Sequence, residues 1–107
     1  MPPGFTRSLA NRLNQLSKYT IKEGEHEELV SGGMVYIAPG GQHMVLDREG
    51  ERLKIVLNTD LPRRGHRPSI DVLLESLKVV KQEMLICAIL TGMGKDGMEG
   101  LKRLKQS

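Results

Sequence analysis

The residues of this 107-residue sequence that are best suited to chemistry lie in the segment Thr91–Gly97. Three glycines, Gly92, Gly94 and Gly97, surround Asp96, which is the only carboxylate of the segment. Glycine allows backbone conformations closed to other residues and a close approach to a bound group. Backbone N–H groups at the start of a following helix can then face an anion or a developing oxyanion. The segment therefore predicts a binding or catalytic loop with one acidic side chain.

Three interpretations of this loop compete. In the first, Asp96 is only the N-cap of a helix that follows a glycine-rich turn. A Walker phosphate loop is the second, and it is excluded because Asp96 follows Gly94-Lys95 where Ser or Thr is required, and Ile89 occupies the position of the first glycine. The third is a dinucleotide-binding loop, since the three glycines have the G-x-G-x-x-G spacing, but its acidic partner would lie beyond the end of the sequence. The first and third stay open on the residues alone.

The elements around the loop predict an α/β fold. Met84–Leu90 is a continuous apolar run of strand length, typical of a parallel strand covered by helices on both faces. Ligands in such sheets bind at the carboxyl ends of the strands, where this loop begins. The other expected elements are a helix over Phe5–Leu16, strands over Thr20–Lys22 and Met34–Ala38, a hairpin of His43–Leu46 and Arg52–Leu57 around an Asp47–Glu51 turn, a loop over Asn58–Pro68, a helix from Ile70 to about Lys81 and a helix over Met98–Lys105.

Apolar residues at helical spacing predict which faces of the two longer helices are buried. The first helix is expected to bury Phe5, Leu9, Leu13 and Leu16, and the second to begin at an N-cap, Ser69. The second is expected to turn inward Leu73, Leu74, Leu77 and Val80.

Four sequence blocks together resemble the chemotaxis response-regulator protein-glutamate methylesterase family, in the family's order and over nearly the whole chain. The blocks are Met-Pro-Pro-Gly-Phe-Thr at 1–6, Val35–Gly40 followed by His43, His66–Asp71, and Ile89–Gly97. The resemblance implies a serine hydrolase on a doubly wound, mainly parallel sheet with an antiparallel hairpin. It places the aspartate of the Ser-His-Asp triad on Asp96 and an oxyanion-hole backbone N–H on Met93. It also places His66 and Arg67 beside the active-site cleft, although packing is the favoured role of His66.

The resemblance further implies a reaction and its partners. The family removes methanol from glutamate methyl esters on the cytoplasmic helices of chemoreceptors, many members also deamidate receptor glutamines, and full-length members carry a regulatory receiver domain. The family's Gly-x-Ser-Thr-Gly-Gly turn does not occur in this sequence, and the family's histidine stands immediately before the Met1 block. Residues 1–107 are therefore expected to be part of a catalytic domain, about half of one of typical size, inactive alone, with the Ser- and His-bearing segment upstream and a C-terminal segment missing.

Two other kinds of function remain as alternatives. One is a nucleotide- or phosphate-binding module that uses the Gly92–Gly97 loop, and the other is a non-catalytic remnant that binds a receptor.

The composition of the sequence argues against several other classes of function. Aromatic residues make up 3% of the sequence and the net charge is only +3, which argues against a base-stacking nucleic-acid surface. A single cysteine, Cys87, excludes an internal disulfide and suits a reducing compartment. The start of the chain lacks a signal peptide, and its apolar runs are too short to cross a bilayer, so a cytoplasmic location is expected. Neither His26 nor His43 belongs to a cluster with metal-ligand spacing, and no cofactor is expected.

Overall fold

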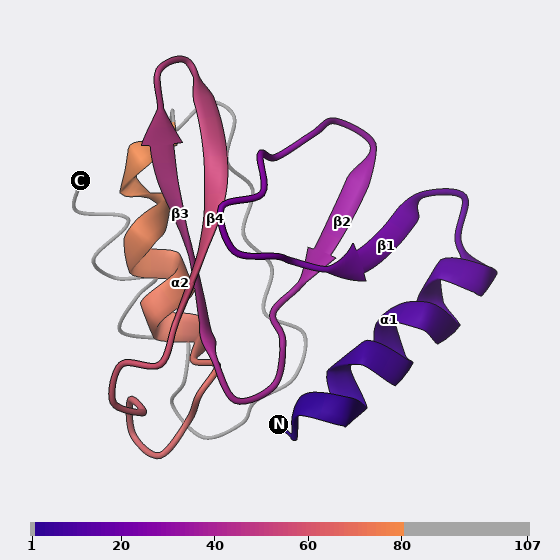
Figure 1. Ribbon diagram of the computed structural model, residues 1–107, viewed down its shortest axis with the longest axis horizontal. Coiled ribbons are helices and arrows are strands. Elements are labelled where there is room, and N and C mark those ends of the chain that lie inside the picture. The colour runs from indigo at the N-terminus through magenta and orange to yellow at the C-terminus, as the bar shows by residue number, and fades with distance from the viewer. Residues whose placement is uncertain (1, 81–107) are drawn as a thin grey trace.

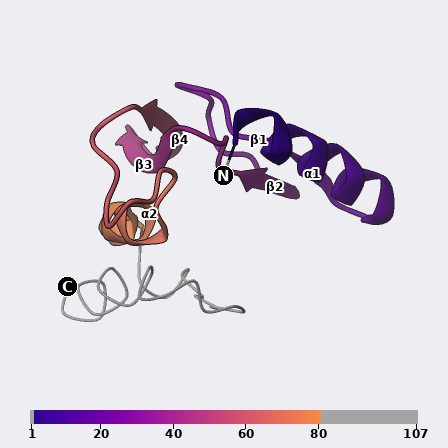
Figure 2. The same ribbon diagram turned by 90° about the horizontal axis from the view of Figure 1, so that it is seen from below.

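The computed structural model describes residues 2–80, in which four short strands lie between two helices along the chain. The order is α1 (Pro3–Leu16), β1 (Thr20–Glu23), β2 (Met34–Ile37), β3 (His43–Glu49), β4 (Arg52–Asn58), α2 (Ile70–Ser76) and a 3-10 turn, η1 (Leu77–Val79). Helix α1 lies beside the β1–β2 pair, and α2 covers one face of the β3–β4 hairpin (Figure 1). Figure 2 shows these two groups of elements from below.

Helix α1 begins two residues earlier than predicted, because two prolines favour its first turn. Pro2 is the extended N-cap and Pro3 the first helical residue, where a missing N–H costs no hydrogen bond. The predicted inward face was wrong. The residues of α1 that are buried are Thr6 and Ala10, which lie one turn apart, whereas the apolar stripe is largely exposed. The face of α1 that is buried therefore carries small side chains, which let the helix approach β1 closely.

Strands β1 and β2 form a parallel pair, in the register Thr20↔Met34 to Glu23↔Ile37. The sequence predicted both segments but gave no sign that they pair with each other. The connection between them, residues 24–33, crosses to β4, where the N–H of Glu27 donates to the Ile55 carbonyl at 2.7 Å. The N–H of Ile55 in turn donates to the Glu28 carbonyl at 2.8 Å. This connection joins the parallel pair to the hairpin.

The hairpin of β3 and β4 has a tighter turn than predicted. The strands pair antiparallel as far as Glu49↔Arg52, so the turn consists of Gly50 and Glu51 instead of the predicted five residues. Gly50 has a φ of 62°, a conformation that favours glycine and that two-residue hairpin turns require. The buried face of the hairpin includes Met44 and Ile55, as the alternation in β4 predicted.

Helix α2 starts where predicted and ends earlier. The Ser69 hydroxyl accepts the N–H of Val72 at 3.4 Å, which confirms the predicted N-cap. The α-helix ends at Ser76 and continues only as η1, closed by a hydrogen bond from the Val80 N–H to the Leu77 carbonyl. Ser76 explains the end, because its hydroxyl donates to the Leu73 carbonyl and so competes with the helical ladder.

The same hydroxyl of Ser76 ties this end of the helix to β3. It accepts the N–H of Leu46 at 3.0 Å, and the guanidinium of Arg48 donates to the Val79 carbonyl at 2.8 Å. Of the four residues predicted to face inward, Leu74 is buried, and Leu73, Leu77 and Val80 are half-buried.

Candidate active site

The predicted catalytic loop falls outside the residues that the structure describes. This applies to Asp96, Met93, Gly92, Gly94 and Gly97, and also to Cys87 and to the expected elements Met84–Leu90 and Met98–Lys105. The described residues supply the framework on the amino-terminal side of that loop, together with His66 and Arg67.

The carboxyl ends of β1 and β2 meet the first turn of α1 at Thr6. The hydroxyl oxygen of Thr6 lies 2.6 Å from a carboxylate oxygen of Glu23, 2.7 Å from the N–H of Gly40 and 3.2 Å from the Pro3 carbonyl. Thr6 has no exposed surface. Since the Gly40 N–H donates, the hydroxyl proton is free for the carboxylate, and the short distance is typical of a charge-assisted hydrogen bond. One hydroxyl therefore joins three segments of the chain.

His43 is an internal support at the start of β3. It is 1% exposed, and its Nε2 lies 3.0 Å from the Leu61 carbonyl. A carbonyl can only accept, so Nε2 carries the proton and donates. His43 thus has a structural role in the described part of the chain. The hydrogen bond holds the loop between β4 and α2 against the hairpin.

The loop that carries His66 and Arg67 is held largely by its own backbone. Arg63 and His66 exchange two backbone hydrogen bonds, at 2.9 and 3.0 Å. The guanidinium of Arg67 donates to the carbonyls of Thr59 and Asp60, at 3.2 and 3.4 Å. Both predicted residues are half-buried. Arg67 therefore shapes the loop through main-chain contacts, and the backbone of His66 closes the same loop.

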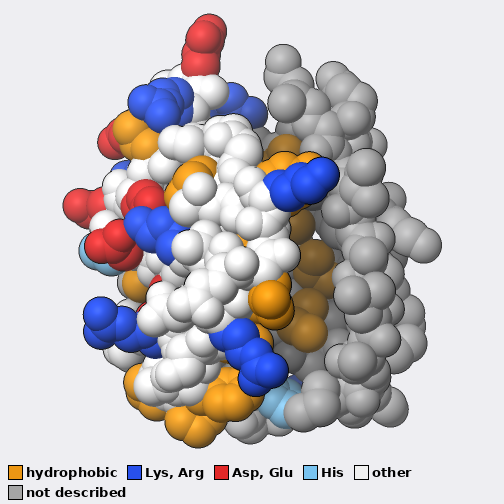
Figure 3. All heavy atoms as spheres, turned by 90° about the vertical axis from the view of Figure 1, so that its right-hand side faces the viewer, with side chains coloured by type: hydrophobic (Ala, Val, Ile, Leu, Met, Phe, Trp, Pro, Cys, Tyr) orange, Lys and Arg blue, Asp and Glu red, His pale blue; other side chains and the backbone are white. Residues whose placement is uncertain are grey.

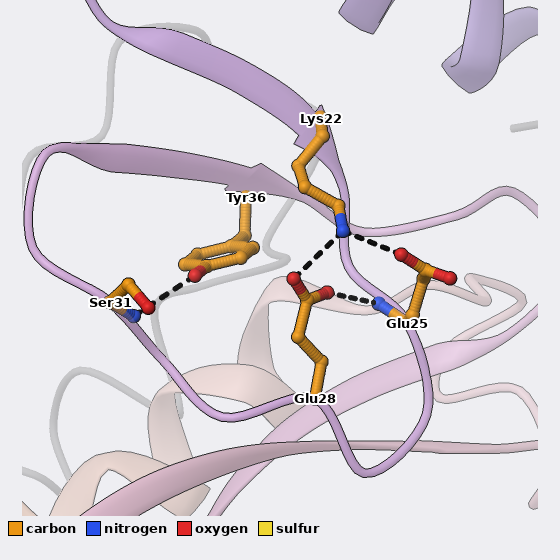
Figure 4. Close-up of polar contacts among 5 residues, drawn as sticks. All are labelled: Lys22, Glu25, Glu28, Ser31 and Tyr36. Carbon is orange, nitrogen blue, oxygen red and sulfur yellow. Dashed lines mark hydrogen bonds and ion pairs between the residues drawn. The ribbon is translucent and has the colours of Figure 1, made fainter.

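A surface cluster of charges closes the turn after β1 (Figure 4). The ammonium of Lys22 lies 2.5 Å from a carboxylate oxygen of Glu25 and 2.7 Å from one of Glu28. The hydrogen bonds that Lys22 donates to these two carboxylates, Glu25 first, raise the pKa of Lys22 from 10.5 to about 12. The hydrogen bond to Lys22 lowers the pKa of Glu25. Each group favours the charged form of its neighbour, which is the arrangement of a structural ion pair rather than of a proton-transfer site.

Beside this cluster, α1 and β1 border a hollow of about 420 Å³. Its lining is polar and of mixed charge, and includes Arg7, Asn11, Lys22, Glu23 and Glu25. Within residues 2–80, no three His, Cys, Asp or Glu side chains are grouped as a metal site would need. Neither helix in that range is long and apolar enough to cross a membrane.

The comparisons with known proteins decide the family. The family model described as CheB methylesterase matches residues 1–107. The chain belongs to the CheB methylesterase family.

Individual members of the CheB methylesterase family match over the same range. A protein of Geobacillus kaustophilus named protein-glutamate methylesterase/protein-glutamine glutaminase is 51% identical over 107 residues, and one of the same name from Halalkalibacterium halodurans is 49% identical over 106. The crystal structure of the Thermotoga maritima CheB methylesterase catalytic domain superposes with a TM-score of 0.93 at 42% identity, over 99% of this chain and 56% of that one. The chain spans 31% of the length of each of the two curated relatives.

Membership of the CheB methylesterase family also confirms the fold class predicted from the sequence. The Thermotoga domain provides the complete fold, and the described strands contribute a parallel pair and an antiparallel pair to it. Sequence reasoning missed Thr6 and Glu23 as a connected pair. The only signal was a polar residue, Thr6, one helical turn before Ala10 on a face without large apolar side chains.

Proposed function

We propose that the protein carrying this chain is a protein-glutamate methylesterase, which hydrolyses glutamate methyl esters on chemoreceptors and releases methanol. The match to the family model over residues 1–107 carries the proposal. Relatives about 50% identical over this range bear that name, and the same name includes glutaminase activity. Hydrolysis of the γ-amide of a receptor glutamine is therefore part of the proposal.

The proposed mechanism is that of a serine hydrolase. A serine oxygen attacks the carbonyl carbon of the γ-ester while a histidine takes the serine proton. The same proton leaves with methanol. Water then attacks the acyl-enzyme, the histidine passes a proton from the water to the serine oxygen, and the receptor is left with a glutamate side chain. In this scheme the Asp96 carboxylate accepts the Nδ1–H of the histidine, and the backbone N–H of Met93 donates to the oxyanion. The glycines of the loop, Gly92, Gly94 and Gly97, permit that backbone path, and His66 and Arg67 border the cleft.

The proposal requires parts that this chain does not contain. None of its six serines stands in a Gly-x-Ser-x-Gly turn, so the nucleophile and its histidine must come from another segment of the catalytic domain. The histidine is expected directly before Met1, with further domain sequence after Ser107. We also propose that the substrates are the cytoplasmic helices of methylated receptors, that the protein works in the cytoplasm, and that a receiver domain regulates it.

A chimera tests the proposed activity directly. This chain replaces the matching 107 residues of the Geobacillus relative, and methanol release from methylated receptor membranes and ammonia release from receptor glutamine are measured. We expect methylesterase activity within about tenfold of the unsubstituted relative, which is a loss of at most about 1.4 kcal/mol of transition-state stabilisation. A folded chimera without either activity would overturn the proposal, and nucleotide binding by that inactive chimera would favour the binding-module alternative.

The role of Asp96 has its own test in the chimera. Asn preserves shape but presents the wrong partner to the histidine Nδ1–H, so we expect Asp96→Asn to lower kcat on the order of a hundredfold or more. The matched control is Asp47→Asn, because Asp47 is exposed on the hairpin and its side chain accepts the local backbone N–H of Arg48 at 2.8 Å. If Asp96→Asn retained activity within about twofold, Asp96 would be a helix cap, which Asn replaces well.

A further inference from the structure

The first turn of α1, the end of β1 and the turn after β2 converge on one buried hydroxyl. Thr6 contacts Glu23, the last residue of β1, at 2.6 Å and the N–H of Gly40, after β2, at 2.7 Å. Thr6 is fully buried, and Gly40 is buried as well. A buried hydroxyl without partners costs free energy, so the position strongly favours a residue that can both donate and accept.

A second contact brings the same turn against the same end of the helix. Gly41 has a φ of 84°, and a side-chain carbon built on it would lie 3.3 Å from the ring of Pro3. The pairing of the strands also continues past their ends, through a hydrogen bond of 3.0 Å from the Gly24 N–H to the Ile37 carbonyl. The start of α1 therefore lies against the turn after β2, next to the carboxyl ends of both parallel strands, and the Thr6 hydroxyl bonds it to both segments.

The carboxyl ends of parallel strands are where α/β proteins place their reacting groups. A helix that starts at this edge constrains the path of the chain just before it. Only Met1 and Pro2 separate its first residue, Pro3, from the position in which the proposed function requires the histidine, and prolines restrict their own backbone and that of the preceding residue. A misplacement of about 1 Å in such a group can cost a hundredfold in rate. The side chain that sets the start of α1 can thus influence the reaction without contacting substrate.

We propose that Thr6 is a positioning residue of the methylesterase site, acting through its hydrogen bonds to Glu23 and Gly40. The inference rests on the proposed function. Its hydroxyl holds the start of α1 against the ends of β1 and β2, and thereby sets the direction in which the preceding histidine enters the site. The role depends on the hydroxyl and not on the methyl group, so serine can replace threonine and valine cannot.

The test compares three variants in the chimera with the Geobacillus relative. Thr6→Val keeps the shape and removes the hydroxyl, Thr6→Ser keeps the hydroxyl, and Thr20→Val is the matched control at the exposed amino end of β1. We expect Thr6→Val to lower kcat about tenfold with KM within about twofold, Thr6→Ser to retain at least about a third of kcat, and Thr20→Val to match the unsubstituted chimera. Thermal melts establish that each protein is folded when assayed.

The outcomes separate this inference from the proposed function. A folded Thr6→Val protein with full kcat would leave Thr6 as a packing residue and overturn the inference alone. If Thr6→Val does not fold, Glu23→Gln decides, since an amide accepts the same hydrogen bond without its charge: at least a threefold fall in kcat at unchanged KM supports positioning, and full kcat overturns it. An inactive unsubstituted chimera would overturn the proposed function and this inference together.

Discussion

Part of the pH dependence of the protein's stability is expected to come from one side chain, that of Lys22. Its pKa is raised to about 12 in the folded protein, against 10.5 ordinarily, by hydrogen bonds to Glu25 and Glu28. A raised pKa means that the protonated lysine stabilises the fold fully below 10.5, and that this contribution disappears as pH rises toward 12. The pKa of Glu25 is lowered, so its contribution is complete above its ordinary value of 4.5 and fades as pH falls through the lowered pKa.

We therefore expect Lys22→Met, measured in the chimera, to lower the unfolding temperature by a few degrees at neutral pH. The difference from the unsubstituted protein should shrink above pH 10.5 and again in acid. Salt at about 1 M should also reduce it, because the screening length then falls to about 3 Å. Lys18→Met, at an exposed position, is the control. An equal effect of the two substitutions at neutral pH would show that the ion pairs contribute nothing measurable.

For single residues, the sequence predicts local motifs better than contacts between residues that are distant in the chain. The types and spacing of residues predicted roles for Asp96 and Ser69, and the N-cap at Ser69, which lies in the described part of the chain, is confirmed. The Thr6–Glu23 contact spans 17 residues and depends on how α1 rotates over β1. No local pattern encodes that rotation, because apolar periodicity predicted a different face of the helix.

Among the elements, the parallel pair packs against the hairpin at Gly24, the residue directly after β1. A side-chain carbon at this position would lie 2.9 Å from the Met44 sulfur and 3.1 Å from a methyl carbon of Ile55. The methionine end can shift, but Ile55 is fully buried and cannot. Glycine at residue 24 is therefore a packing requirement between the two pairs of strands.

We expect Gly24→Ala to destabilise the fold by about 1–3 kcal/mol, the usual cost of overpacking a core. Gly32→Ala is the matched control, since nothing lies within 4 Å of a side-chain carbon there. It should change stability by no more than about 0.5 kcal/mol. Chemical denaturation of both variants in the chimera provides the measurement, and equal midpoints would mean that the core around Ile55 relaxes freely.

The elements also show which predictions depend on local signals. Ser69 fixed the start of α2, and Gly50 allowed a two-residue turn that extends the hairpin beyond the predicted strands. The parallel pairing of β1 with β2 and the path of residues 24–33 along β4 involve contacts distant in sequence. Such contacts depend on the packing of the whole domain, so strand segments could be predicted but their partners could not.

For the molecule as a whole, the distribution of apolar surface predicts how the isolated chain behaves. In residues 2–80, Ala10, Met44, Ile55 and Leu74 are the buried hydrophobic residues. On the side that carries α1, hydrophobic side chains reach the surface (Figure 3). The large exposed ones in the described range are Phe5, Leu13, Leu16, Tyr19, Val35, Leu61 and Ile70.

We expect the isolated 107-residue chain to be at most marginally stable, to self-associate and to release no methanol from methylated receptor. Its described apolar surface includes Leu16, which is 77% exposed, and Val35 on β2, which is 41% exposed, and surface of this kind drives association. Light scattering after size exclusion measures self-association, and urea denaturation measures stability.

The double substitution Leu16→Lys and Val35→Thr should reduce association, whereas Ser8→Lys, at an already polar exposed position of α1, should leave it unchanged. A monomer that unfolds cooperatively with about 5 kcal/mol or more would contradict the prediction, since that stability is typical of a self-sufficient domain. Methanol release by that monomer would in addition place the nucleophile on this chain.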